Sequence, residues 1–169
     1  EIYEEYKGKF DFVCSAEVIT EKDTIVGVIT AKHCITPGLR YEVRTHTNKR
    51  LVVEGDAFVH FTSDIVYLPV KPSWKPKFGK VNPKKPLVIY HSALGKPVKL
   101  QGEVLFVGKV GDLRIPVHWL DPEDTITLIK AIGFGGMSGS PVYQGNTRVG
   151  VMSGSGAGMS IIITPSGVM

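Results

Sequence analysis

The stretch Gly135-Gly136-Met137-Ser138-Gly139-Ser140-Pro141 decides which fold and function we expect of this chain. It places a serine among small residues, and its glycines permit backbone angles that other residues resist and let another chain approach closely. Glycine and serine are also common in ordinary hairpin loops. The stretch alone therefore fits a nucleophile turn or a plain loop. A nucleophile would also need a base, an acid that orients the base, and an oxyanion site.

The composition is that of a globular protein with much β-structure. The chain has 169 residues, of which 43% are hydrophobic and 21% are charged, and this length suffices for a sizeable core. Its 19 glycines and 11 prolines, together with short Val/Ile-rich runs, favour an all-β fold. No apolar run approaches the roughly 20 residues that a helix needs to span a bilayer. We therefore expect no transmembrane segment in this chain.

Short runs rich in β-branched residues predict two sets of strands. The first set lies before residue 70, at 10–19, 24–30, 41–45, 49–54, 56–61 and 65–70. The second set lies at 87–91, 98–107, 113–119, 125–130, 147–153 and 160–164. The connections are short enough for closed antiparallel barrels. Little helix is expected, because no long segment has a helical period.

Residues 71–86 separate the two sets and are predicted to be a linker. The segment holds six lysines, four prolines and no acidic residue, whereas the whole chain has a net charge of only +4. Four prolines exclude a central strand or helix. The expected organisation is thus residues 1–70 as one unit, 71–86 as the linker and 87–169 as the second unit. Lysines beside Trp74 and Phe78 could contact RNA or an acidic surface. The alternative is a solvated, proline-stiffened connector.

Three residues could supply the chemistry around the serine. The Ser138 hydroxyl needs a neutral imidazole to take its proton, and that imidazole needs an acceptor on its other nitrogen. His33 follows an apolar strand, and Asp64 stands just before one. Asp56 is the alternative to Asp64. The other histidines, 46, 60, 91 and 118, are interpreted as ordinary barrel or surface residues. No Cys/His cluster has zinc-ligand spacing, so no metal or cofactor is expected.

Four blocks, in the same order along the chain, resemble the chymotrypsin family of serine proteases. Thr30-Ala31-Lys32-His33-Cys34 resembles its Thr-Ala-Ala-His-Cys block, and Asp64-Ile65-Val66-Tyr67-Leu68 resembles its Asp-Ile-Ala-Leu-Leu strand. Gly136-Met137-Ser138-Gly139-Ser140-Pro141 is similar to its Gly-Asp-Ser-Gly-Gly-Pro turn. Val149-Gly150-Val151-Met152-Ser153-Gly154 resembles the strand beside its specificity pocket. The order His, Asp, Ser is the one that this family uses.

The resemblance implies an all-β fold of two six-stranded antiparallel β-barrels, with the active site in the cleft between them. It implies that His33 acts as general base and then acid, that Asp64 holds its tautomer, and that Ser138 attacks the substrate carbonyl. The backbone N–H groups of Gly136 and Ser138 would form the oxyanion hole. The expected activity is that of a serine endopeptidase acting on a polypeptide substrate.

Cys14 and Cys34 match the disulfide that this family has beside the catalytic histidine. The residues by themselves leave a disulfide and two buried thiols both open, because the outcome depends on the compartment.

One departure from the digestive members bears on activation and origin. Those members carry an aspartate before the nucleophile, which captures a freed N-terminus, whereas this chain has Met137 there. Activation by N-terminal trimming is therefore not expected. The chain resembles the compact proteases of positive-strand RNA viruses, which process a polyprotein that can include their own precursor. They act in the host cytoplasm or at membrane-associated replication sites. The rival lineage is bacterial, secreted or periplasmic.

The specificity pocket is assigned by aligning the same blocks. Ile132 falls at the pocket base, where an aspartate would select basic side chains, so an apolar or aromatic P1 residue is favoured. The remaining substrate-binding residues are expected to be Gly133, Phe134, Met152, Ser153, Gly154 and Ser155. The last three would bind the substrate backbone as an added strand.

A protein of another class would use the same fold without catalysis. This alternative is a protease-like module that binds RNA or protein through the basic linker. The intact set of His33, Asp64 and Ser138 argues against it.

Overall fold

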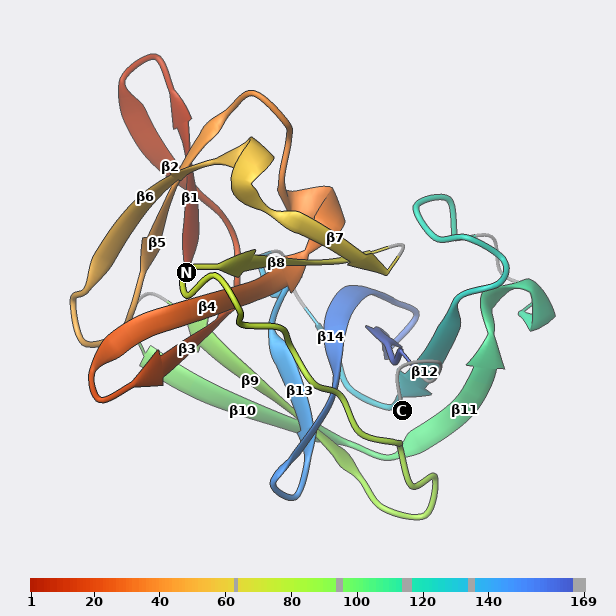
Figure 1. Ribbon diagram of the computed structural model, residues 1–169. Helices are drawn as coiled ribbons and strands as arrows, with labels where there is room; N and C mark the ends of the chain where they lie inside the picture. The colour runs from red at the N-terminus through yellow and green to blue at the C-terminus, as the bar shows by residue number, and fades with distance from the viewer. Residues whose placement is uncertain (63, 94–95, 114–116, 134–135, 166–169) are drawn as a thin grey trace.

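The computed structural model describes residues 1–62, 64–93, 96–113, 117–133 and 136–165. Within these ranges the chain forms 15 β-strands and three short 3-10 helices (Figure 1). Eight strands precede the lysine-rich segment 71–86, and seven follow it. No described segment is a helix with the length and apolar character needed to cross a membrane.

The N-terminal half consists of two four-stranded antiparallel sheets, in the orders β2-β1-β5-β6 and β3-β4-β8-β7. Its strands are β1 (Ile2–Tyr6), β2 (Lys9–Cys14), β3 (Glu17–Glu21), β4 (Thr24–Ala31), β5 (Arg40–Arg44), β6 (Arg50–Glu54), β7 (Val59–Thr62) and β8 (Ile65–Pro69). The 3-10 helices η1 (Lys32–Cys34) and η2 (Gly55–Ala57) lie between them.

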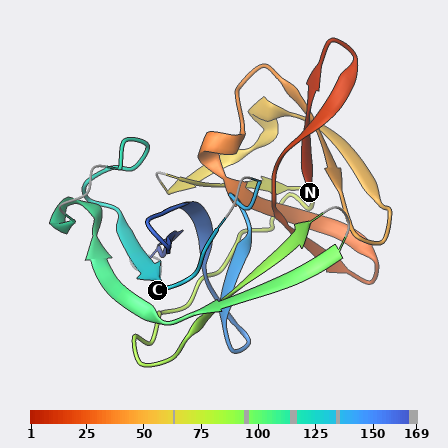
Figure 2. The ribbon, with the colours of Figure 1, turned by 180° about the vertical axis from the view of Figure 1, so that it is seen from behind.

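The C-terminal half is one curled antiparallel sheet of seven strands, in the order β10-β9-β13-β14-β15-β12-β11. Its strands are β9 (Leu87–Ala93), β10 (Lys96–Gly102), β11 (Val104–Lys109), β12 (Thr125–Ile129), β13 (Pro141–Gln144), β14 (Thr147–Gly156) and β15 (Met159–Ile163). The helix η3 (Val110–Asp112) follows β11. In both views the β9 and β10 strands reach toward β3 of the other half (Figures 1 and 2).

The double β-barrel architecture is as predicted, but the strand counts of six and six are wrong. The predicted strand 10–19 is two strands, because the chain turns a corner at Ser15 and Ala16 and passes from one sheet into the other. The start of the chain also forms a strand, since the fully buried Ile2 packs into the core of this half. The strand predicted at 113–119 is not found where the structure describes it: residues 117–119 lie in a loop, and 114–116 are outside the described residues.

Strands β4 and β8 lie at the centre of the molecule, which explains their uninterrupted apolar sequences. Successive side chains of a strand point to opposite faces. Val28 of β4 joins the core cluster of the N-terminal half, whereas Ile29 and Ala31 join a cluster shared with the C-terminal half. That shared cluster also contains Val151 and Ile163. Both faces of β4 are therefore buried, and the strand holds the two halves together.

The segment 71–86 forms no strand and crosses the front of the molecule between the two halves in Figure 1. The Trp74 ring lies against Gly27, where a Cβ atom would collide with it, and makes an edge contact with Tyr67. Phe78 is only 6% exposed. The aromatic residues of this segment are thus packed against the protein, and its lysines lie on the surface.

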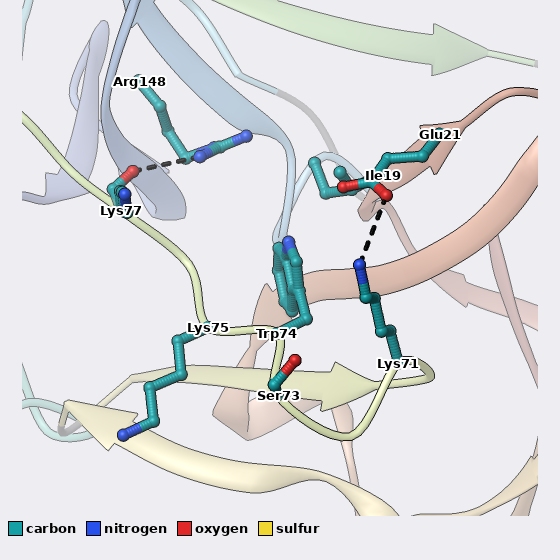
Figure 3. A pocket seen from close by; sticks show the side chains of 8 residues that line it. All are labelled: Ile19, Glu21, Lys71, Ser73, Trp74, Lys75, Lys77 and Arg148. Carbon is teal, nitrogen blue, oxygen red and sulfur yellow. Dashed lines mark hydrogen bonds and ion pairs between the residues drawn. The ribbon is translucent and has the colours of Figure 1, made fainter.

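A charged cluster ties this segment to both halves. Arg148 of β14 donates from Nε to Oε1 of Glu17 on β3 at 2.6 Å, and from Nη2 to Oε2 at 3.2 Å. Its Nη1 donates to the main-chain oxygen of Lys77 at 3.0 Å (Figure 3). The Tyr143 hydroxyl also donates to Glu17. Burial, and then the contact with Glu17, raise the pKa of Tyr143 to about 12.

Replacing Arg148 by Met should destabilise the protein by about 3 kcal/mol, because Glu17 would keep its burial and lose its cation. The measurement is the free energy of unfolding in urea. Arg40→Met is the matched control: the Arg40 side chain is 51% exposed and pairs with Glu5 and Glu54, so its loss should cost less than about 1 kcal/mol. Equal stability of the two variants would contradict this role of Arg148.

Candidate active site

Strand pairing brings His33 and Asp64 together. In the β4–β8 ladder Ala31 is paired with Ile65, so the residues just beyond these two ends meet at the edge of the sheet. The main-chain N–H of Lys32 donates to the Asp64 carbonyl at 3.1 Å, and η1 then turns His33 toward the carboxylate. The side chains therefore meet because two buried strands end at the same level.

The His33 ring is bonded to a carboxylate that is almost fully buried. Its Nδ1 lies 2.9 Å from Oδ2 and 3.0 Å from Oδ1 of Asp64, and its main-chain N–H donates to Oδ1 at 3.0 Å. Asp64 is 1% exposed, whereas the His33 side chain is 36% exposed. An imidazole that donates its Nδ1–H to a carboxylate presents the Nε2 lone pair on its other side, as a general base requires.

Ser153 and Trp119 extend this arrangement behind Asp64. The Ser153 hydroxyl donates to Oδ2 of Asp64 and accepts a hydrogen bond from Nε1 of Trp119 at 2.7 Å. The Trp119 ring lies over Gly154, with its centroid 6.3 Å from that of His33. The sequence interpretation placed Trp119 in a strand and gave it no role in the site, because its partners Ser153, Gly154 and His33 are all distant in sequence.

The turn at residues 136–141, called the nucleophile turn below because it carries the predicted nucleophile Ser138, is held by its own backbone and by the buried Met137. Gly136 and Gly139 have φ angles of 90° and 91°, a region that favours glycine. The N–H of Ser140 donates to Met137 O at 3.0 Å, and the N–H of Gly139 donates to Met152 O at 2.8 Å. Met137 is fully buried in the core of the C-terminal half. The turn therefore presents Ser138 and points the preceding side chain inward.

The N-terminal half holds the same turn from the other side. The N–H of Ser15 donates to Ser138 O at 2.9 Å, and Thr30 Oγ1 donates to Ser15 O at 2.8 Å. A Cβ atom on Gly139 would collide with both Ser15 O and Thr30 Oγ1. The contact between the halves thus requires glycine at position 139.

Cys14 and Cys34 form a disulfide with their Cα atoms 6.1 Å apart. Cys14 precedes Ser15, which holds the nucleophile turn, and Cys34 follows His33. Cys34 Sγ also lies 3.9 Å from Ser138 O. The bond therefore joins the segment that carries the histidine to the segment that holds the serine turn.

Ser138 is joined to the His33–Asp64 pair through Ser153. The hydrogen bond that its hydroxyl makes in the described part of the chain goes to the main-chain oxygen of Ser153, at 3.2 Å. Asp64 and His33 are therefore in direct contact. Ser138 is connected to them through Ser153, whose main-chain oxygen accepts from Ser138 and whose hydroxyl donates to Asp64. The two predicted oxyanion residues, Gly136 and Ser138, lie in this same turn.

The strand expected to bind substrate has one open edge. β14 pairs with β13 only from Thr147 to Val151, but it pairs with β15 as far as Gly156. From Ser153 onward, no described strand pairs with its other side. An extended peptide could add there by main-chain hydrogen bonds.

The predicted pocket residues lie in different environments, and Ile132 does not lie in one that fits a pocket. Gly133 lies against the Met152 methyl group and Ser155, so that an added Cβ would stand 2.9 Å from Ser155 Cβ. Met152 is buried, at 1% exposed. Ile132 is 76% exposed, which is not the environment of a pocket base: the chain alternates after β12, with Ala131 buried and Ile132 turned outward. Phe134 lies outside the described residues.

The other acidic and histidine candidates differ from the His33–Asp64 pair in burial and in contacts. Asp56 is exposed in η2, and the carboxylate in contact with His33 is that of Asp64. The side chains of His46, His60 and His118 are exposed. His91 is 5% exposed, on the same face of β9 as the buried Leu87 and Ile89, and its contact with Ser15, 76 residues away, is one that the local sequence does not reveal.

Solved structures of serine proteases share this fold. The Rv3671c protease of M. tuberculosis, in its inactive form, matches with a TM-score of 0.68 and 15% identity over 98% of this chain and 83% of that chain. A human pathogenic astrovirus serine protease matches with a TM-score of 0.62 and 11% identity over 96% and 87%. The HtrA-type protease AlgW matches with a TM-score of 0.69 and 12% identity over 95% and 50%. No protein-family model matches the chain, and no curated protein sequence matches it.

The fold is therefore that of the chymotrypsin-like serine proteases.

Replacing both Cys14 and Cys34 by Ala should lower the free energy of unfolding by about 3 kcal/mol, because the disulfide closes a loop between positions 20 residues apart. Thermal and urea unfolding measure this loss. The unaltered protein in a strong reductant should unfold like the double variant. If the double variant unfolds at the same midpoint as the oxidised protein, the disulfide does not stabilise the fold.

Proposed function

We propose that this chain is a serine endopeptidase that cleaves peptide bonds through an acyl-enzyme, with His33, Asp64 and Ser138 as its catalytic triad. The observation that carries the proposal is the contact between the His33 ring and the buried Asp64 carboxylate, beside a glycine turn that presents Ser138. A histidine oriented in this way takes a proton from a serine hydroxyl much better than a free imidazole does.

The proposed reaction follows from these positions. The Ser138 hydroxyl exchanges its bond to Ser153 O for one to His33 Nε2 and passes its proton there as Oγ attacks the substrate carbonyl. The N–H groups of Gly136 and Ser138 stabilise the oxyanion. His33 then gives the proton to the leaving amine, and the acyl-enzyme forms. A water molecule, deprotonated by His33, releases the acyl group and restores the serine. Asp64 keeps its charge throughout and stabilises the imidazolium.

A fluorophosphonate probe tests the nucleophile without knowledge of the peptide substrate. The native protein should be labelled at Ser138, and labelling should disappear in Ser138→Ala and fall at least about 100-fold in rate in His33→Ala. Ser73→Ala is the matched control, because Ser73 is an exposed serine of the linker, and it should label like the native protein. A native protein that stays unlabelled would overturn the proposed function.

We further propose an apolar or aromatic P1 residue. The described residues beside the expected pocket, Gly133, Met152 and Ser155, carry no charge, and the buried Met152 methyl group packs directly behind Gly133. A peptide library with every residue at P1 should therefore be cleaved preferentially after large apolar side chains. Preferential cleavage after Lys, Arg, Glu or Asp would contradict this assignment.

Within this class, we propose that the substrate is a viral polyprotein, including the chain's own precursor. The fold match to an astrovirus serine protease, over most of both chains, supports this choice. The bacterial alternative has similar support from the match to the M. tuberculosis protease. Cleavage at the ends of the chain in a longer translated precursor, abolished by Ser138→Ala, would favour the polyprotein.

The positive charge of the linker is the feature that supports its predicted contact with RNA or an acidic surface. All six lysines of this segment are exposed, and Lys71 pairs with Glu21 at 3.7 Å (Figure 3). Trp74 and Phe78 pack against the protein, so stacking on bases has no support from them. The proposed division into 1–70, 71–86 and 87–169 places this surface between the two barrels.

A further inference from the structure

A buried histidine of the C-terminal half lies behind the nucleophile turn. His91 of β9 places Nδ1 3.0 Å from the Ser15 hydroxyl and 3.5 Å from the Ser140 hydroxyl. The Ser15 hydroxyl in turn donates to the main-chain oxygen of Gly136 at 2.7 Å. His91, Ser15 and Ser140 are all less than 6% exposed. These contacts connect β9, the corner between β2 and β3, and the turn that carries Ser138.

The number of protons fixes the direction of these hydrogen bonds. A serine hydroxyl has one proton, and that of Ser15 goes to Gly136 O. The His91 nitrogen that faces Ser15 must therefore supply a proton of its own, which requires the tautomer with Nδ1–H. Burial lowers the pKa of His91, so the ring is neutral at pH 7. The result is a neutral chain of donors from His91 to Ser15 to Gly136.

Ser15 thereby holds two carbonyl groups of the turn. Its hydroxyl fixes Gly136 O, and its main-chain N–H fixes Ser138 O. The peptide that carries the N–H of Ser138 lies between these two carbonyls in the chain. Rotation of that peptide would turn its N–H away from the oxyanion site, and the two bonds from Ser15 oppose such a rotation. Gly136, with its φ of 90°, has no side chain to restrict its backbone, so a hydrogen bond to its carbonyl removes freedom that the residue itself leaves open.

We propose that Ser15 and His91 are positioning residues that hold the oxyanion site of the nucleophile turn from behind, with His91 supplying the proton that fixes the Ser15 hydroxyl. Neither residue touches the substrate. The proposal rests on the proposed protease function. It assigns a task to a histidine and a serine outside the triad, and it accounts for the burial of three polar side chains behind the turn.

Two variants of His91 and one of Ser15 test the proposal. His91→Leu removes the donor at similar volume, whereas His91→Asn keeps an N–H near the position of Nδ1. Ser15→Ala removes the hydroxyl and leaves the main-chain bond to Ser138 O in place. We expect His91→Leu and Ser15→Ala to lower kcat and the rate of fluorophosphonate labelling about 10-fold, with KM changed less than about 2-fold. The expected 10-fold loss is smaller than the roughly 100- to 1000-fold loss of kcat on removal of an oxyanion donor, because these variants misplace the donor and do not remove it. His91→Asn should regain most of the rate.

Arg148→Met is the matched control for lost stability. It removes a buried polar contact between the halves, as His91→Leu does, but Arg148 lies at the linker and contacts neither Ser15 nor the turn. Assayed well below its unfolding midpoint, it should keep the native kcat. If Arg148→Met and His91→Leu lose kcat equally, or if His91→Asn is no better than His91→Leu, the positioning role is wrong. Should His91→Leu fail to fold, Ser15→Ala alone decides: native kcat in that variant overturns the proposal.

A spectroscopic test is independent of activity. Long-range ¹H–¹⁵N spectra at pH 7 should show His91 as the neutral tautomer protonated at Nδ1, and a proton on Nε2 alone would overturn the proposal. The outcomes also separate this inference from the proposed function. An unlabelled native protein defeats the protease assignment, whereas a labelled native protein with an equally fast His91→Leu variant defeats only the role of His91.

Discussion

The hydrogen bond from the Ser15 N–H to Ser138 O is the contact on which the candidate site depends, because it fixes the nucleophile turn of one half to the backbone of the other. Ser15 follows Cys14, whose disulfide reaches Cys34 beside His33. The residue that would attack and the residue that would take its proton are therefore linked by one hydrogen bond and one covalent cross-link. A shift of either half would move both groups together, which preserves their geometry better than separate attachment to two flexible edges would.

This single contact is held in place by packing at a distance from it. The cluster shared by Ile29, Ala31, Val151 and Ile163 excludes water between the halves, and the paired charges of Glu17 and Arg148 cross the same boundary near the linker. Apolar burial supplies most of the free energy of association between the halves. It does little to fix their relative orientation, because its strength depends on the apolar area that is buried and not on the alignment of particular groups. The charged pair has the opposite properties: its net contribution is modest after desolvation, but its bidentate geometry permits only one alignment of β3 with β14. The two kinds of contact together set how the barrels meet.

Sequence patterns predicted the features that local chemistry determines. The apolar runs of β4 and β8 were recognisable in the sequence. So were His33 and Asp64 next to these runs, because a polar residue beside an apolar run indicates where a buried strand ends. The predictions that do not match the structure depended on contacts distant in sequence or on the path of the backbone beyond a strand end. The run 10–19 reads as one strand, but Cys14 is drawn into one sheet and Glu17 into the other. Ile132 aligns with a pocket base, yet the backbone after β12 turns it outward. His91 and Trp119 meet their partners 76 and 34 residues away in sequence, and no local pattern encodes such contacts.

Among the described residues, Met137 and the His91–Ser15 pair hold the turn through apolar packing and neutral hydrogen bonds. A buried charge requires an equally buried partner, and the desolvation of the pair is costly. Here the side chain before Ser138 is apolar and packs with Leu87, Ile89 and Ile129, while the carbonyls on the outer side are held by neutral donors. The turn is therefore stabilised by the same cluster that stabilises the C-terminal sheet. Its geometry follows from the folding of that sheet and from the contact with Ser15.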